Sequence, residues 1–351
     1  MRKIYLVVGI VLALFVAAIA AYYWGFSPKR TSLPFKKANA IYYWKTWFEV
    51  GDEEIEFLKK NEIKRMYVRF FDVAINKNSK FRDKCAPVAT ISFDERPLQL
   101  VAAENIEIIP VVFITQEAIR EYSSFTDDLA HRLYEMCSKN KIDINEVQLD
   151  CDWTKTTHDA YFQFVKDVRQ TLNSYFKKEV ILSSTIRLHQ LAQTPPAVDY
   201  GVLMCYNTGN FRDYKTQNSI LDVKDVKPYM KYLKSYNLPL VLGLPVYSWV
   251  VEFDEDKQFV RLRNPYDVHG WGKVWEEDCE TGNGEEEYFE REESHKAKKM
   301  SRYEVVSDET ILEAKRLVRS EYGNIPVVLY HLDLQQLSKY SENEIKDFYN
   351  K

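Results

Sequence analysis

The sequence predicts an α/β protein built as a (β/α)8 barrel, the TIM barrel fold, with an insertion after the seventh strand and an N-terminal transmembrane helix. Apolar runs alternate with amphipathic stretches, a pattern typical of βαβ units and a parallel sheet. Eight such runs occur, and eight units close naturally into a barrel. A doubly wound open sheet is the alternative, but it usually has fewer strands, and no glycine-rich nucleotide turn follows the first run.

The hydrophobic patterns set the expected boundaries of each element. The expected strands cover residues 40–48, 64–75, 107–115, 146–153, 179–188, 200–208, 239–249 and 326–334. The expected helices cover residues 51–62, 94–105, 124–140, 157–176, 223–236, 307–322 and 341–350. After the fifth strand, the stretch HQLAQTPPAVD is short and interrupted by proline, so we expect a weak or missing helix there.

Residues 250–306 interrupt the alternation and are far longer than an ordinary loop between a strand and a helix. The alternating stretches FVRLR and YFERE look like strands of a small added unit. We therefore expect an inserted subdomain here. Trp271 and Trp275 favour a wall beside a ligand cleft, and a peripheral partner surface is the alternative.

The N-terminus has the features of a membrane anchor. Residues 4–26 contain no charged side chain and follow Arg2 and Lys3, and about 20 apolar residues suffice to cross a bilayer. We expect a single-pass anchor with the globular part outside the cytoplasm, periplasmic or extracellular. A cleaved signal peptide, with a processing site at Ala18-Ile19-Ala20, is the alternative. This divides the chain into an anchor at 1–27, a linker at 28–38 and a barrel at 39–351.

Composition limits the possible partners. The net charge is -4, from 48 basic and 52 acidic residues, so no overall electrostatic attraction to nucleic acid is expected. The five cysteines are odd in number and show no spacing typical of a metal site or a disulfide framework. We therefore expect no nucleic-acid partner and no metal or other cofactor.

The end of the fourth expected strand carries two acids. In VQLDCDWT, Asp150 and Asp152 are two positions apart, and side chains at i and i+2 of a strand point the same way. Both would face the barrel mouth, where active sites of this fold lie. Two close carboxylates do not both ionise easily, so one pKa should rise and supply a proton donor. Alternatively, the two acids form buried ion pairs with Arg69 or Arg187.

Other strand ends supply polar and aromatic side chains suited to a sugar. Aromatic faces stack on the apolar faces of sugar rings, while acids, amides and guanidinium groups hold hydroxyls. The predicted catalytic pair is Asp150 and Asp152. The predicted substrate-binding residues are Trp44, Arg69, Asp72, Arg187, Tyr206, Asn207, Tyr247, Trp249 and Asp333. The predicted partner is a carbohydrate polymer or oligosaccharide.

Three segments in order resemble the family 18 glycoside hydrolases, the chitinase group. VQLDCDWT matches the family's strand-four motif DGIDIDWE at its two later acids and its tryptophan. LMCYNT falls on the family's Met-x-Tyr-Asn segment, and LGLPVY at 242–247 resembles its seventh strand. The strand-four stretch also resembles uncharacterised bacterial barrel families. The resemblance implies a barrel that acts on amino-sugar glycans.

The departures from this family concern catalysis. The family's proton donor is the glutamate that closes the strand-four motif, and Thr154 stands there. Val147 replaces the motif's first aspartate, and Tyr330 replaces a tryptophan near the end of the eighth strand. In the family an aspartate orients the substrate acetamide, which attacks the sugar carbon. A threonine hydroxyl does not act as a general acid near neutral pH, so the usual mechanism is expected to fail.

Three functions are consistent with these residues. The first is a membrane-anchored, glycoside hydrolase-like protein that acts on or binds extracytoplasmic glycans, with Asp152 as acid or base and Asp150 modulating its pKa. The second is a non-catalytic carbohydrate-binding barrel. The third is metal-assisted hydrolysis using His331 and Asp333 with the two acids, for which the sequence has no HxH or HExxH motif.

Overall fold

The computed structural model describes residues 32–75, 85–121, 125–266, 284–285 and 300–350. The predicted transmembrane anchor lies outside these residues, as do Trp271 and Trp275 of the insertion. Among the helices of the described ranges, none is both long enough and apolar enough to cross a bilayer.

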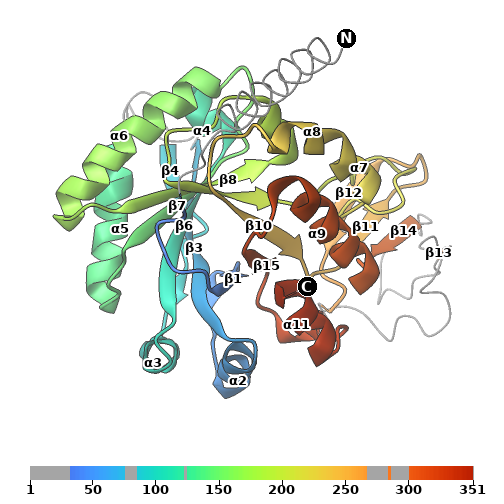
Figure 1. The fold of residues 1–351 in the computed structure, drawn as a ribbon, viewed down its shortest axis with the longest axis horizontal. Coiled ribbons are helices and arrows are strands. Elements are labelled where there is room, and N and C mark those ends of the chain that lie inside the picture. Colours follow the sequence, from blue (N-terminus) through green and yellow to red (C-terminus); the bar gives the residue numbers. More distant parts are fainter. Residues whose placement is uncertain (1–31, 76–84, 122–124, 267–283, 286–299, 351) are drawn as a thin grey trace, which may run out of the picture.

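Eight parallel strands of the described chain close into a barrel (Figure 1). Hydrogen-bonded neighbours follow the order β1, β15, β10, β9, β8, β7, β6 and β3, and pairing of β1 with β3 completes the ring. The predicted barrel is therefore confirmed, and the open sheet is wrong. The strands are β1 (Asn39–Tyr43), β3 (Ile63–Ile75), β6 (Glu107–Ile114), β7 (Glu146–Asp150), β8 (Ile181–Arg187), β9 (Tyr200–Met204), β10 (Leu240–Pro245) and β15 (Val327–Tyr330). A further strand, β4 (Cys85–Val88), extends β3 in the antiparallel direction.

The first strand is shorter than its apolar run suggested. The Tyr43 hydroxyl donates to the carbonyl of Trp47 at 2.6 Å and accepts from the amide of Glu49 at 2.7 Å. These bonds turn the chain away from the barrel after β1. Trp47 and Phe48 form β2 (Trp47–Phe48), which pairs with β5 (Ser92–Phe93) outside the ring.

Helices cover the outside of the barrel (Figure 1). In α6 the buried residues recur at helical spacing, from Tyr161 through Phe164 and Val168 to Leu172, so one stripe faces the strands. Among the described residues, the helices of more than five residues are α2 (Asp52–Lys60), α3 (Glu95–Ala103), α5 (Thr126–Asn140), α6 (His158–Phe176), α9 (Asp308–Tyr322) and α11 (Glu342–Asn350).

Proline breaks the helix expected at 223–236. The stretch forms α7 (Val223–Val226), a 3-10 turn (Lys227–Tyr229) and α8 (Met230–Leu233) instead of one helix. Pro228 lacks an amide N–H, and its ring collides with the carbonyl four residues earlier. The segment after β8 is likewise a short 3-10 helix at Leu188–Ala192, as its prolines suggested.

The insertion carries a small antiparallel sheet. Its described strands run in the order β12 (Phe259–Arg263), β11 (Trp249–Phe253), β14 (Met300–Glu304) and β13 (Gly284–Glu285). Two buried carboxylates in it are paired. Arg261 and Arg263 both bind Glu252, and Arg302 binds Glu304 at 2.6 Å. The sheet begins directly beyond β10 and therefore lies next to the barrel mouth.

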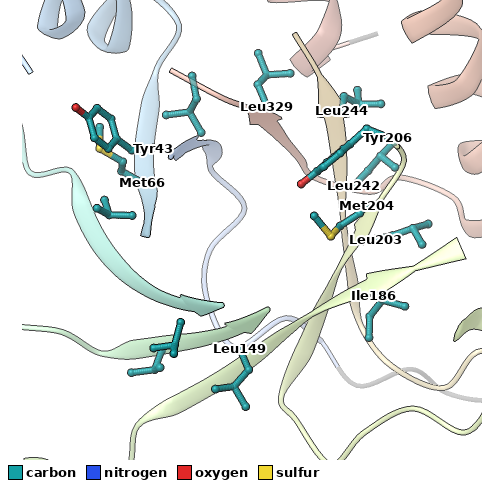
Figure 2. Packing of buried hydrophobic residues seen from close by; sticks show 14 of the residues in the cluster. Tyr43, Met66, Leu149, Ile186, Leu203, Met204, Tyr206, Leu242, Leu244 and Leu329 are labelled. Atoms are coloured by element: carbon teal, nitrogen blue, oxygen red, sulfur yellow. The ribbon is translucent and has the colours of Figure 1, made fainter. Parts of the chain in front are cut away.

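Side chains alternate between the barrel interior and the helix layer. Tyr42, Tyr67, Val111, Val202 and Val328 belong to an inner cluster within the ring. Figure 2 shows Leu203 on one side of β9, with Met204 on the other. The alternation expected of barrel strands therefore holds through this region.

The N-terminal end of the barrel is closed by an ion-pair network and by the segment before β1. Arg65 of β3 binds Glu107 at 2.6 Å and also binds Glu146, which is fully buried. The ring of Phe35 lies 3.8 Å from the Arg65 guanidinium and makes an edge contact with Tyr200 at 5.0 Å. Residues in the second half of the expected linker therefore pack on the barrel.

Removing the Phe35 ring should weaken the fold. Phe35→Ala loses a cation–π contact and an apolar cover over the barrel end, so we expect the free energy of unfolding to fall by about 2 kcal/mol. Urea denaturation of the full chain in mild detergent measures this change. Phe35→Leu keeps apolar bulk but loses the ring, so its free energy of unfolding should lie between those of the wild type and Phe35→Ala. A change below about 0.5 kcal/mol for Phe35→Ala would contradict the described packing.

Candidate functional site

Asp150 ends β7 and points into the barrel mouth. Its side chain is 3% exposed, and the Thr185 hydroxyl of β8 donates to its Oδ1 at 2.6 Å. Leu149 and Cys151 on either side belong to the outer apolar cluster, as strand alternation requires. The predicted inward orientation of Asp150 follows from this arrangement.

Asp152 lies just beyond the strand end and is much more accessible, with 41% of its side chain exposed. Its Oδ1 accepts a hydrogen bond from Nε of Arg187, the last residue of β8. The alternative prediction was an ion pair of these acids with Arg69 or Arg187, and the structure has the pair between Asp152 and Arg187. Asp150 has a neutral hydrogen-bond donor in Thr185 and lies close enough to Arg187 to feel its charge.

The pKa of Asp150 departs from the ordinary value of an aspartate. Burial raises the pKa of Asp150 to about 6, and the neighbouring charge of Asp152 raises it further, while Arg187 opposes both effects. The rise occurs at the deeper acid, which water does not reach. Asp152, which lies nearer the solvent, forms its ion pair with Arg187.

Arg69 and Asp72 of β3 form a second ion pair at the rim. Nε of Arg69 donates to Oδ1 of Asp72 at 2.7 Å, and Nη2 binds the other carboxylate oxygen. In a regular strand, residues three apart point to opposite sides. The register between β3 and β6 shifts between Arg69 and Phe71, and this bulge brings both side chains together.

Aromatic rings line the mouth around Tyr330, the last residue of β15. Its ring stacks on Tyr206 at 5.0 Å and lies 5.6 Å from both Trp44 and Tyr247. The Arg69 guanidinium lies 5.4 Å from the Trp44 ring. Tyr206 and Tyr247 are buried, whereas Trp44 and Tyr330 keep part of their surface accessible.

Gly243 on the adjacent strand makes room for Tyr206. A Cβ atom at this glycine would lie 3.2 Å from the Tyr206 ring, and 3.3 Å from a backbone carbonyl. The glycine of the LGLPVY stretch therefore lets the Tyr206 ring approach this strand closely. The Tyr206 hydroxyl is buried and has no hydrogen-bond partner among the described residues.

Two further predicted residues are held by defined partners. The Tyr247 hydroxyl donates to Oδ1 of Asn207, which leaves the amide N–H groups of this exposed residue toward solvent. The indole N–H of Trp249 donates to Glu304 of the inserted sheet at 2.9 Å. Trp249 thus links the barrel mouth to the insertion, with its ring 5.4 Å from that of Tyr247.

Asp333, which was predicted to bind substrate, caps a helix beyond β15. Its carboxylate accepts from the amides of Gln335 and Gln336 at 3.0 and 3.2 Å and caps the short helix α10 (Leu334–Leu337). Neighbouring His331 has its pKa lowered to about 4 by burial. No group of three His, Cys, Asp or Glu side chains in the described ranges is arranged to hold a metal ion. The alternative of a metal site formed by His331, Asp333 and the two acids is therefore not present among the described residues.

Thr154 stands where the resembling family has its acid. The Thr154 hydroxyl pairs with that of Thr156 at 2.9 Å, and its amide donates to the Thr157 hydroxyl at 2.9 Å. These bonds form the turn that leads into α6. The described turn supplies hydroxyl groups at this point of the mouth and no carboxyl group.

Two polar side chains in the barrel interior behind Asp150 were not predicted from the sequence. Gln148 and Glu146 alternate with Val147 and Leu149 and point into the barrel. Gln148 accepts from the Tyr42 hydroxyl at 2.6 Å, and Glu146 accepts from the Ser183 hydroxyl at 2.6 Å. The signal was visible in the sequence, because the polar series continues at intervals of two up to Asp152.

The chain is similar in structure to chitinases and to a spore cortex-lytic enzyme. The Bacillus cereus spore cortex-lytic enzyme SleL has a TM-score of 0.51 and 14% identity, over 90% of this chain and 74% of that one. A mutant class V chitinase from Nicotiana tobaccum in complex with NAG4 has a TM-score of 0.50 and 10% identity, over 90% and 99%. The chitinase-like agglutinin RobpsCRA from Robinia pseudoacacia has 0.50 and 14%, over 88% and 98%.

These similarities confirm the resemblance inferred from the sequence at the level of the fold. No protein-family model matches the chain, and no curated protein is significantly similar to it in sequence. The identities of 14% and below carry the barrel architecture and leave the activity to be argued from the residues at the mouth.

The raised pKa of Asp150 gives a test of its burial. An unfolded aspartate titrates near pH 4, roughly its ordinary pKa, so between about pH 4 and 6 the folded protein keeps a proton that the unfolded chain releases. Stability from this group therefore falls as the pH rises through that window. Asp150→Asn should remove this dependence and be more stable than wild type at neutral pH by about 1–3 kcal/mol.

Denaturant titrations at several pH values measure the effect. The matched control is Asp256→Asn in the exposed β11–β12 hairpin, which should keep the wild-type pH profile. An unchanged slope in Asp150→Asn between pH 4 and 6 would show that the carboxyl group is ionised throughout, contrary to its buried environment.

Proposed function

We propose that this chain binds glycans containing N-acetylglucosamine at the barrel mouth and does not cleave them by substrate assistance. The single observation that carries the proposal is the state of the two groups that such catalysis would need. Thr154 offers a hydroxyl at the acid position, and Asp152 beside it is held by Arg187. A carbohydrate-binding barrel uses the same fold without requiring either group.

The accessible parts of the mouth suit a sugar. Trp44 and Tyr330 present apolar ring surface, on which the carbon face of a sugar ring can stack. Asn207 offers amide donors, and Asp152 and Arg187 offer an acceptor and donors for hydroxyl groups. The similar tobacco chitinase structure holds NAG4, and the Robinia protein is an agglutinin, which supports both the ligand and a binding role.

Hydrolysis through Asp150 is the second candidate. Its pKa of about 6 is suitable for a proton donor at mildly acidic pH. The carboxyl group is 3% exposed and already hydrogen-bonded to Thr185, so a glycosidic oxygen would have to reach it past Arg187 and Asp152. This access requirement makes binding the better supported function.

We also propose that the N-terminal segment anchors the protein in a membrane, with the barrel outside the cytoplasm. The support is the sequence of residues 4–26, which is uncharged and apolar over a length that spans a bilayer. A glycan-binding mouth fits an extracytoplasmic location, where polymers of amino sugars are exposed.

Binding should depend on the aromatic surface of the mouth. Trp44→Ala removes the ring on which a sugar would stack, so we expect affinity for chitotetraose to fall at least tenfold, an effect of about 1.4 kcal/mol. Calorimetric titration of the full chain in detergent measures it. Tyr134→Ala, at an exposed aromatic on the outer helix α5, is the control and should bind as wild type does. Undetectable binding by the wild type to any amino-sugar oligomer would overturn the proposal.

Restoring an acid should not suffice to restore catalysis. Thr154→Glu supplies a proton donor, but Arg187 still holds Asp152 away from an acetamide. We expect no chitotetraose cleavage by this variant, and slow cleavage by Thr154→Glu/Arg187→Met, in which Asp152 is released. Product analysis by mass spectrometry gives the readout, with Arg187→Met alone as the control. Cleavage by the wild type that is lost in Asp150→Asn would favour the second candidate function.

A further inference from the structure

We propose that the N-terminal face of the barrel lies against an anionic lipid surface, so that the glycan-binding mouth points away from the membrane. This rests on the proposed membrane anchor. The face is defined by the chain segments that precede the barrel strands, and the mouth lies at the opposite ends of the same strands.

The start of the described chain is fixed to this face. Phe35 covers Arg65 at the N-terminal end of the ring, and Lys37 donates to the carbonyl of Asn324 at 3.1 Å, in the turn before β15. Leu33 packs on the inner cluster as well. The described chain therefore begins at the end of the barrel opposite the candidate site.

The connection to the proposed anchor is short. The apolar stretch ends at Phe26, and Leu33 already packs on the barrel. An extended chain covers at most about 3.5 Å per residue, so these seven steps reach no more than about 25 Å. The face is thereby kept within a few Debye lengths of the bilayer, whatever path the connection takes.

The same face carries exposed lysines. Lys36 precedes β1, Lys141 precedes β7, Lys177 precedes β8, and all three are exposed. Within the described ranges, none of the three has a carboxylate in ion-pair contact. Lys64, at the start of β3, is exposed too and donates to the carbonyl of Glu104.

The acids of this face are fewer or already paired. Glu107 binds Arg65, Asp143 binds Lys178, and Asp199 binds Arg169. Glu62, Glu179 and Glu321, which lie in the segments before β3, β8 and β15, remain as exposed carboxylates. The excess is positive, and lysines near a membrane surface are attracted by anionic headgroups over about a Debye length. Charge complementarity therefore selects an anionic bilayer as the occupant of this face.

Lysine footprinting of the full chain in vesicles tests the orientation. One set of vesicles contains phosphatidylcholine alone, and the other adds phosphatidylglycerol. We expect acetylation of Lys36, Lys141 and Lys177 by a water-soluble reagent to slow severalfold in the anionic vesicles, and to recover at high salt. Lys155 and Lys215, which follow β7 and β9 on the mouth side, should react equally in both.

Variants sharpen the result. Lys36→Gln/Lys141→Asn/Lys177→Asn should abolish the lipid-dependent protection of Lys64, while Lys155→Gln/Lys215→Gln should leave it intact. Asparagine is chosen where the lysine has a positive φ, 56° at Lys141 and 52° at Lys177. Equal acetylation in both vesicles, or protection of Lys155 and Lys215 instead, would overturn the proposal.

The anchor is tested separately. Release of the wild-type chain from vesicles by alkaline carbonate would show that the N-terminal segment does not span the bilayer. Co-sedimentation of that released chain with phosphatidylglycerol vesicles would then test separately whether the face with the exposed lysines binds anionic lipid. Binding that is lost in the triple variant supports the face, and absence of binding overturns it. Glycan affinity measured in detergent is independent of both results.

Discussion

The structure depends on one constraint, the burial of a polar ladder along β7. Glu146, Gln148 and Asp150 all point into a closed ring, where water cannot satisfy them, so every group must find a partner from another strand. Glu146 forms an ion pair with Arg65 and accepts a hydrogen bond from Ser183. The Tyr42 hydroxyl donates a hydrogen bond to Gln148, and the Thr185 hydroxyl donates one to Asp150. Partners from β1, β3 and β8 thus tie distant parts of the barrel to this one strand.

The same ladder determines the chemistry at the mouth. Asp152 continues the series beyond the strand end, where a charged partner stabilises it, and Arg187 from β8 supplies that partner. The guanidinium of Arg187 therefore sets the orientation of this carboxylate at the rim. Two positions further on, Thr154 places a hydroxyl group at the strand end, where it pairs with the hydroxyl of Thr156.

Much of the architecture could be predicted from the alternation of apolar runs and amphipathic stretches, since that pattern alone implies parallel strands covered by helices. The inward orientation of Asp150 followed from the same period of two. The pairing of Arg69 with Asp72 could not be read, because a bulge changes the side to which a residue points. The capping of α10 by Asp333 could not be predicted either, since it depends on where the chain turns after β15.

The two ends of the barrel complement each other. At the N-terminal end, Phe35 and the Arg65 network cover the interior and hold the incoming chain. At the other end, Trp44 and Tyr330 keep ring surface accessible above the buried acid. A protein held by its closed end presents its open end to whatever lies beyond the point of attachment. Under the proposed binding function, with Thr154 at the acid position of the resembling family, that geometry favours retention of a surrounding polymer over its breakdown.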